Sequence, residues 1–326
     1  MQYLVRKPWQ LPERLHTPES VYGNRGLHRR EFLASLGMSA AAFGLGGCGR
    51  PSDEELQAAG DAALSTQARS IYPAPHNTTF EYGRPETVER DTAEYTNFYE
   101  FSTRKDSWKH VGSFQPSPWT VEVDGLCAKP RKFDLDDLIS HPRLQIEERH
   151  YRHRCVEAWA MCVPWTGFRL SDLLKIVEPL PAAKFVAFET FHRPEEAPHM
   201  GRSDFPWPYR EGLTLAEATN ELTLLATGIY GHPLPKQNGA PVRLVVPWKY
   251  GFKCIKSIVR ITLTESQPPT FWNTLWAEAY DFTANVNPEV PHPNWPQYTE
   301  RMLGTREVFP TVLYNGYGKF VATLYS

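Results

Sequence analysis

Short stretches of alternating or continuous apolar residues recur between positions 119 and 263, and they predict β-strands. Residues 119–123 alternate apolar and polar side chains and lead into Asp124-Gly125, a dipeptide typical of turns. Such alternation indicates a strand with one face against a core. Four further segments are short and largely apolar, as expected of buried strands: residues 184–190, 222–229, 242–246 and 258–263.

Between these segments the sequence predicts short helices that begin at polar capping residues. Asp134 is a candidate N-cap for a helix through Leu138, and Thr214 is a candidate for another. A third helix is expected to begin at Ser171 and to end before Pro179, with an apolar stripe of Leu173, Leu174, Ile176 and Val177. The pattern predicts an α+β fold of mixed sheets with short helices and long loops.

Repeats, charge and composition exclude several classes of protein. The sequence has no internal repeat and no alternating strand-helix series with a glycine-rich phosphate turn, so direct use of NAD is not expected. With 35 basic and 37 acidic residues the formal charge is -2, and the chain lacks the basic surface that nucleic-acid binding requires. The 29 prolines and 13% aromatic residues indicate a loop-rich globular domain.

The first part of the chain has the features of an export signal. Arg29-Arg30 and Phe32 precede a weakly apolar stretch, residues 36–47, that is rich in Ala and Gly. This combination is typical of the twin-arginine route, and the stretch is shorter than the ~20 residues that span a bilayer. We therefore expect a periplasmic protein. The expected divisions are an export signal in residues 1–48, a linker or N-terminal arm in residues 49–74, and one folded domain in residues 75–326.

The cysteines do not form a disulfide framework, because the chain has only five and they are widely spaced. Cys48 follows Leu45-Gly46-Gly47, which resembles a lipoprotein processing site, so a lipid anchor at Cys48 is an alternative to release of the mature protein. Cys127 and Cys162 are either simple buried residues or a pair. At least one thiol is expected to have another role.

Cys155 has the most unusual surroundings of these thiols. It ends the run Tyr151-Arg152-His153-Arg154-Cys155, just before a helix-capable stretch around Ala158. Nearby positive charge favours the thiolate, which is the form that binds soft metals. Two other interpretations stay open. One is a structural cysteine, against which the flanking charges argue. The other is a zinc site of unusual spacing, opposed by the neighbouring arginines and formed by His150, His153, Cys155 and Cys162.

Three separated blocks give a more specific indication: residues 151–167, residues 95–101 upstream and residues 237–243 downstream. These blocks, in their order along the chain and behind a twin-arginine leader, resemble the catalytic subunits of periplasmic protein-methionine-sulfoxide reductases. Those subunits belong to the sulfite-oxidase fold group. The resemblance covers most of the chain from about Tyr72 onward. It implies a sulfite-oxidase-type fold, a molybdopterin-binding catalytic domain over residues 75–326, and removal of oxygen from methionine sulfoxide in exported proteins.

By this resemblance, Cys155 is the thiolate ligand of molybdenum, and the dithiolene of a single molybdopterin supplies the other sulfur ligands. An arginine and a lysine suit the phosphate of that cofactor, and amides and a hydroxyl suit its pterin ring. Gly251 permits a tight turn that would present backbone N–H groups to the phosphate. The resemblance implies molybdopterin contacts from nine positions: Asn97, Glu100, Phe101, Thr190, Asn238, Arg243, Cys254, Ile255 and Lys256.

Glu157, two residues after the proposed metal ligand, is the candidate for moving protons. Sulfoxide reduction consumes protons, and we hypothesise that this carboxyl group helps to deliver or organise them. A salt bridge from Glu157 to Arg152 or Arg154 is an equally good interpretation of the sequence. Trp159 and Trp165 either line a pocket for the thioether or belong to the core.

Two alternative functions stay open. The first is a sulfite dehydrogenase of the same fold, although sulfite-oxidising relatives have different residues after the metal cysteine than Val156 and Glu157. Sulfite would need a cationic pocket, for which the sequence offers Arg152, Arg154 and Arg202. The second is a non-catalytic periplasmic binding protein, which would have no need of a thiolate at position 155.

The electrons for a reductase must come from another protein. The chain has neither a Cys-x-x-Cys-His haem site nor a ferredoxin-like cysteine series. The resemblance implies a haem-binding membrane subunit, fed from the quinone pool, as the electron donor. It also implies that oxidised periplasmic proteins are the substrates.

Overall fold

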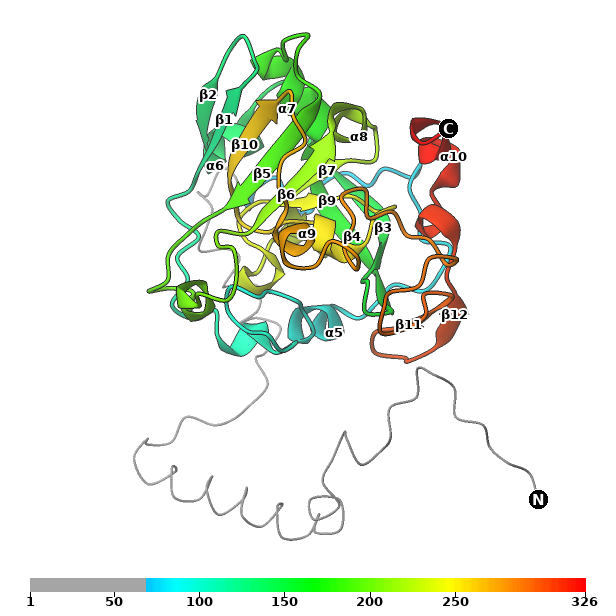
Figure 1. Ribbon diagram of the computed structural model, residues 1–326. Helices are drawn as coiled ribbons and strands as arrows, with labels where there is room; N and C mark the ends of the chain where they lie inside the picture. Colours follow the sequence, from blue (N-terminus) through cyan, green and yellow to red (C-terminus); the bar gives the residue numbers. More distant parts are fainter. Residues whose placement is uncertain (1–68) are drawn as a thin grey trace, which may run out of the picture. The chain divides into compact units, whose positions relative to one another are not determined.

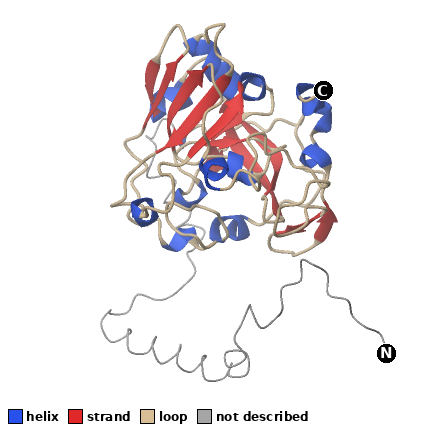
Figure 2. Cartoon of the chain, viewed as in Figure 1, coloured by secondary structure: helices blue, strands red, loops and turns tan. Residues whose placement is uncertain are grey.

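The computed structural model describes residues 69–326, so the expected export signal and the lipid anchor at Cys48 lie outside the described residues. The described chain forms two mixed β-sheets joined by long loops and short helices, as Figure 2 shows. This arrangement confirms the predicted α+β class. Within residues 69–326, no helix is long and apolar enough to cross a membrane.

The first sheet has five strands, which lie at the upper left of Figure 1. Strands β1 and β10 run parallel, and the other neighbours run antiparallel. Ile261 of β10 pairs with Phe188 of β5, so large apolar side chains of neighbouring strands share one face. The strand order is β2 (Arg131–Asp134), β1 (Thr120–Gly125), β10 (Ile258–Thr264), β5 (Phe185–Thr190) and β6 (Arg210–Thr214).

The second sheet is built around β4 (Trp159–Arg169), of which every residue except Arg169 is buried. Strand β3 (Glu147–Arg154) pairs with β4 as an antiparallel hairpin, and β9 (Arg243–Val245) pairs with β7. The main strand order is β12 (Val308–Pro310), β11 (Thr299–Met302), β4, β7 (Leu224–Ile229) and β8 (His232–Pro233). Neither β3 nor β11 was predicted from the sequence, because β3 is mostly charged and β11 is only four residues long.

Thr214 caps a short helix, as the sequence predicted. Its hydroxyl accepts a hydrogen bond from the Glu217 N–H (3.2 Å), and the Glu217 carboxylate accepts one from the Thr214 N–H (2.9 Å). The helices are α5 (Glu89–Glu94), α6 (Leu135–Ser140), α7 (Leu170–Val177), α8 (Leu215–Thr219), α9 (Phe271–Leu275) and α10 (Gly318–Val321). Single 3₁₀ turns are η2 (Ser107–Lys109), η3 (Pro198–Gly201), η4 (Lys236–Asn238), η5 (Gly251–Lys253), η6 (Leu313–Gly316) and η7 (Ala322–Leu324).

Two local predictions about helices were wrong, and a third, the cap at Asp134, was confirmed in position only. Helix α7 begins at Leu170, one residue before the expected cap Ser171. Asp134 does precede α6, but its carboxylate accepts a hydrogen bond from the Thr120 hydroxyl (3.0 Å) on the neighbouring strand instead of capping the helix. Ala158 lies in no helix. It has a positive φ of 65° in the tight turn between β3 and β4.

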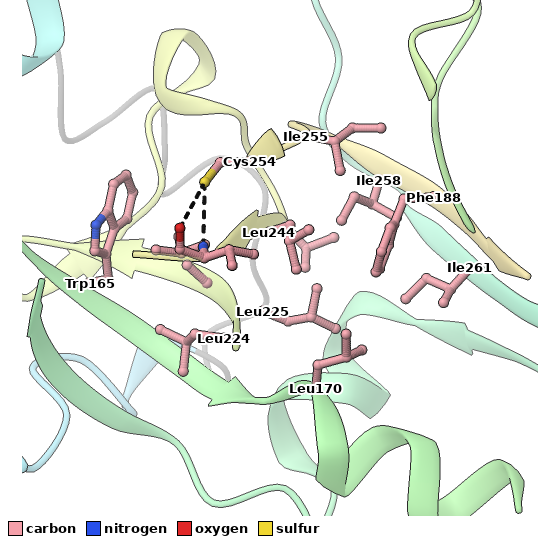
Figure 3. Packing of buried hydrophobic residues seen from close by; sticks show 14 of the residues in the cluster. Trp165, Leu170, Phe188, Leu224, Leu225, Leu244, Cys254, Ile255, Ile258 and Ile261 are labelled. Carbon is pink, nitrogen blue, oxygen red and sulfur yellow. Dashed lines mark hydrogen bonds between the residues drawn. The ribbon is translucent and has the colours of Figure 1, made fainter. Parts of the chain in front are cut away.

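The core contains side chains from both sheets, as Figure 3 shows around Leu225, Leu244 and Ile261. Leu225 and Leu244 are partners across β7 and β9, and both are buried. At the edge of this cluster the Val246 N–H donates to the Cys254 sulfur (3.4 Å). The core therefore fixes the chain at Cys254, directly before Ile255 and Lys256 of the predicted site.

Candidate active site

A cavity with about 800 Å³ of space between protein atoms, its mouth included, lies beside the β3–β4 turn. Its walls come from segments far apart in the sequence: the loop around residue 97, the β3–β4 turn, and the chain on either side of β9 and η5. Nine of the predicted site residues line it: Asn97, Glu100, Cys155, Glu157, Asn238, Arg243, Cys254, Ile255 and Lys256.

Cys155 is the first residue of the β3–β4 turn and lies on the cavity wall. Its N–H donates to the Trp159 carbonyl (2.9 Å), and its carbonyl accepts from the Ala158 N–H (3.0 Å). Its sulfur is within 3.4 Å of the Asn97 amide nitrogen. Burial, and then the negative charge of Glu157, raise the pKa of the Cys155 thiol to about 12. The thiol is therefore protonated at neutral pH in the cofactor-free protein.

The expectation that Arg152 and Arg154 surround this thiol was wrong. The Arg152 side chain donates to the Tyr82 carbonyl (2.5 Å), away from the cavity. The Arg154 guanidinium is fully buried and pairs with Glu300 (3.1 Å), and it also donates to the Cys155 carbonyl. Alternate side chains of a strand point to opposite faces, so Arg152 and Arg154 point away from the face that carries Cys155.

The same alternation rules out the zinc site. His153 and Cys155, which follows the end of β3, both line the cavity, and His150 lies on the opposite face of β3. Cys162 is the cross-strand partner of Arg152, so it also lies on the opposite face, in a small apolar cluster with Tyr82. Among the described residues the cysteines are all free thiols, so Cys127 and Cys162 do not form a pair.

Glu157 is held by Lys105, a residue that the sequence analysis missed. The ammonium of Lys105 is 2.6 Å from the Glu157 carboxylate, which also accepts from Asn97 (3.1 Å) and from the Trp159 indole (3.2 Å). Burial opposes its ionisation, but Lys105 and these other donors outweigh burial and lower the pKa of Glu157 below its usual value. Neither of the expected salt bridges, to Arg152 or to Arg154, is present.

Two cations in the cavity, Arg243 and Lys256, form no ion pair with a carboxylate of the described chain. Arg243 is buried over the Trp165 ring (4.7 Å), and it donates to the Asn238 carbonyl (2.9 Å). Burial, and then repulsion by Arg243, lower the pKa of Lys256 to about 8. Burial raises the pKa of Glu100 to about 7, against the attraction of Lys256. Arg243 and Lys256 thus have no ion-paired carboxylate, and the ionised Glu157 of the same cavity is paired with Lys105 instead.

The donors and acceptors of this cavity fit a pterin that carries a phosphate. Two buried polar atoms at the cavity have no hydrogen-bond partner in the described chain, the Asn97 side-chain oxygen and the Arg243 Nε. Buried polar atoms are nearly always paired, so both call for a polar ligand. Burial, and then Arg243 and Lys256, lower the pKa of His153 to about 3, which keeps its imidazole neutral beside the cavity.

Phe101 and Thr190, the other two predicted site residues, lie behind the cavity wall. Phe101 packs edge-on against Phe98 and Phe114 in the aromatic core. The Thr190 hydroxyl donates to the carbonyls of Lys256 (2.8 Å) and Ser257 (3.0 Å). Thr190 therefore fixes the backbone that carries Lys256. Trp159 lines the cavity, whereas Trp165 is fully buried beneath Arg243.

The sequence analysis also missed the aromatic side of the cavity, formed by Tyr95, Tyr99, Tyr209, Phe252, Trp272 and Tyr280. Trp272 links two of these rings, because it meets Tyr99 edge-on (centroids 4.8 Å apart) and stacks on Tyr280 (5.0 Å). Tyr95 and Tyr99 belong to the block of residues 95–101, but for the other four rings the only sequence signal was the aromatic content of the chain. A glycine was expected at position 251 because of a tight turn. The structure gives a different reason, because a Cβ at Gly251 would collide with the His153 ring.

We expect Lys256→Met to stabilise the cofactor-free protein at pH 7 by about 3 kcal/mol, because a charged lysine is destabilising where its pKa falls from 10.5 to about 8. The unfolded chain binds this proton more tightly, so the cost is full below pH 8 and disappears as pH rises to about 10.5. Urea unfolding between pH 7 and 10.5 measures the difference. Lys175→Met, at an exposed lysine, is the control. A less stable Lys256→Met protein at pH 7 would contradict the prediction.

The comparisons with known proteins agree with this geometry. Residues 109–272 match the family described as the oxidoreductase molybdopterin binding domain, which confirms the expected molybdopterin-binding fold. Two similar proteins carry the name protein-methionine-sulfoxide reductase catalytic subunit MsrP. The one from Gluconobacter oxydans (strain 621H) is 47% identical over 99% of this chain and 96% of its own length. The one from Burkholderia mallei (strain ATCC 23344) is 44% identical over 97% of this chain and 93% of its own length.

Among solved structures, the sulfane dehydrogenase SoxCD from Paracoccus pantotrophus matches with a TM-score of 0.42 and 17% identity, over 64% of this chain and 48% of that one. The two MsrP proteins are far more similar and are covered over nearly their whole length. On that similarity, the chain belongs to the family of protein-methionine-sulfoxide reductase catalytic subunits and contains a molybdopterin-binding oxidoreductase domain.

Proposed function

We propose that this chain reduces methionine sulfoxide in exported proteins, with molybdenum bound to Cys155 and to one molybdopterin. The observation that carries the proposal is the pairing of a buried thiol with two unpaired cations in one cavity. A protonated thiol with a pKa of about 12 becomes a thiolate when a metal replaces its proton. A phosphate on the same ligand would neutralise Arg243 and Lys256.

Different residues of the cavity would bind different parts of this cofactor. Arg243 and Lys256 suit the phosphate, and the free Asn97 oxygen and the Asn238 side chain suit the pterin ring. Glu100, Cys254 and Ile255 complete the wall. Thr190 and Phe101 act from behind it, the first through the Lys256 carbonyl and the second through packing. When bound, the cofactor supplies the two-electron oxygen-atom-transfer chemistry that sulfoxide reduction requires.

The aromatic side of the cavity suits a methionine side chain as substrate. Tyr99, Trp272 and Tyr280 form a continuous aromatic surface. Sulfur groups make favourable contacts with aromatic rings, and a neutral sulfoxide needs no counter-charge there. The three arginines that were expected to form a pocket for sulfite do not line this cavity. Arg152 and Arg154 point away from the cavity, and Arg202 is paired with Asp204 at 2.5 Å outside it.

Reduction of a sulfoxide to a thioether releases one water and consumes two electrons and two protons. The Lys105 ammonium and the Glu157 carboxylate hold a proton beside Cys155, since the two groups are 2.6 Å apart and Glu157 is 3.8 Å from the Cys155 sulfur. We propose that this pair delivers protons to the oxygen that leaves the substrate. The carboxylate is the acceptor and Lys105 is the donor within the pair.

Export by the twin-arginine route and a periplasmic location belong to the same proposal, on the strength of Arg29-Arg30 and the apolar stretch that follows. The two relatives are named as catalytic subunits, which supports a second subunit as the electron donor. We propose a haem-binding membrane subunit fed from the quinone pool. Oxidised periplasmic proteins are the proposed substrates.

Molybdenum content tests the central claim. Elemental analysis of the purified mature protein is expected to give one molybdenum per chain, and Cys155→Ser is expected to lose the metal or to change its coordination, because an alkoxide is a poor ligand for a soft metal centre. Cys127→Ser is the control, since Cys127 is buried outside the cavity. Zinc in place of molybdenum, or full molybdenum and full activity in Cys155→Ser, would refute the assignment.

Glu157→Gln tests the proton role. We expect kcat for a methionine sulfoxide substrate to fall at least tenfold with KM little changed, because the amide cannot accept a proton from Lys105. Molybdenum content measured in the same samples separates this effect from cofactor loss. Glu289→Gln, at an exposed carboxylate, is the matched control. Full turnover by Glu157→Gln across the pH range would exclude the role.

An assay with and without membranes tests the proposed electron donor. Sulfoxide reduction with a quinol as electron source is expected to require membranes that contain the partner, because this chain has no haem or iron–sulfur motif of its own. The assay compares purified protein with and without such membranes. A reduced dye that bypasses the partner provides the control for enzyme competence. Equal quinol-driven rates in the absence of membranes would contradict the donor.

A further inference from the structure

A cluster of imidazole and carboxylate groups lies on the face of β3 opposite the cavity. It comprises Glu148 and His150 from β3, His76 from the segment before Phe80, and Glu81, which follows Phe80. None of these residues lines the cavity that holds Cys155. From this cluster we infer a second metal site, for one Zn²⁺ ion bound by His76, Glu148 and His150.

The distances suit a small tetrahedral ion. Ligand atoms that bind zinc at about 2.0–2.1 Å lie roughly 3.3 Å from each other. The Glu148 carboxylate oxygen is 3.3 Å from His150 Nε2 and 3.7 Å from His76 Nδ1. One ligand atom from each of the three residues lies within 4.8 Å of the others. An ion between them therefore needs only a small inward shift of the side chains.

Glu81 supplies the second observation that points to a metal. Its two carboxylate oxygens accept from the outer ring nitrogens, His76 Nε2 (2.9 Å) and His150 Nδ1 (3.1 Å). His150 Nε2 lies within hydrogen-bond distance of Glu148 as well (3.3 Å), and an ion between them would take the place of the proton on that nitrogen. A carboxylate behind each ligating histidine is the usual arrangement at protein zinc sites, where it fixes the tautomer and strengthens the ligand.

The scaffold holds these ligands in place before any ion binds. The backbone pairs His76 with Glu148, because the Asn77 N–H donates to the Glu148 carbonyl (2.8 Å) and the Glu148 N–H to the Pro75 carbonyl (2.8 Å). Tyr82 stacks flat on the His150 ring at 4.5 Å. Two carboxylates, Glu81 and Glu148, lie beside the imidazoles and would oppose the charge of a dication. Part of each ligand is exposed, so a water can take the fourth position.

Zinc binding to the molybdenum-loaded full chain tests this site, because the loaded cofactor already occupies Cys155. Calorimetry with Zn²⁺ after treatment with a chelator is expected to show one site per chain. His76→Ala and His150→Ala are each expected to weaken it more than about 100-fold, and Glu81→Gln about 10- to 100-fold. His192→Ala, at an exposed histidine outside the cluster, is expected to bind as the unaltered chain does.

Cobalt gives an independent readout of the same site. Co²⁺ in place of Zn²⁺ is expected to show the visible absorption of a tetrahedral ion, and His150→Ala is expected to abolish it. Reductase activity of each variant shows that the chain has folded. Absence of saturable Zn²⁺ binding, or equal binding by the unaltered chain and both histidine variants, would overturn the inference while leaving the reductase assignment untouched.

Discussion

The position of Cys155 depends on the burial of one guanidinium group, that of Arg154. It pairs with Glu300 of β11 (3.1 Å), donates to the Gln297 side chain (2.9 Å), and donates to the Cys155 carbonyl. A buried cation without such partners would cost several kcal/mol, so these groups must all be in place together. Glu300 is also paired with Arg84. The turn that carries the thiol is thus held from behind, by charges that do not face the cavity.

The second constraint is a mismatch of charge inside the cavity. The neighbouring buried lysines each have an anion, since Lys249 pairs with Glu217 and Lys253 pairs with Glu211 at 2.7 Å. Arg243 and Lys256 have none, and burial lowers the pKa of both. A fold that satisfies some buried cations and leaves two unsatisfied at a cavity is arranged for an anionic ligand. The family match names a ligand class of that kind, molybdopterin.

Local sequence patterns predicted the structural features that depend on residues close together in the chain. Thr214 and Glu217 are three residues apart, and their capping box was predictable for that reason. Strand β3 was missed because polar side chains occupy both of its faces, so it shows no apolar alternation. Lys105 was missed because it reaches Glu157 only through tertiary folding. The family resemblance nevertheless identified eight residues that line one cavity, and the hypothesis about Glu157 added a ninth, because resemblance carries tertiary information that periodicity lacks.

Alternate side chains of strand β3 point to opposite faces, so the residues of the cavity and those of the outer cluster lie on different sides of the strand. His153 faces the cavity and Cys155 follows at the end of the strand, whereas Glu148 and His150 face the opposite side. Glu148 and His150 are paired within the ladder, with Thr166 and Pro164 of β4, but Cys155 lies beyond its last pair. An ion at the outer cluster would therefore stiffen the paired part of the strand and tie the segment at His76 to it. It would not touch the turn, whose geometry Arg154 sets separately.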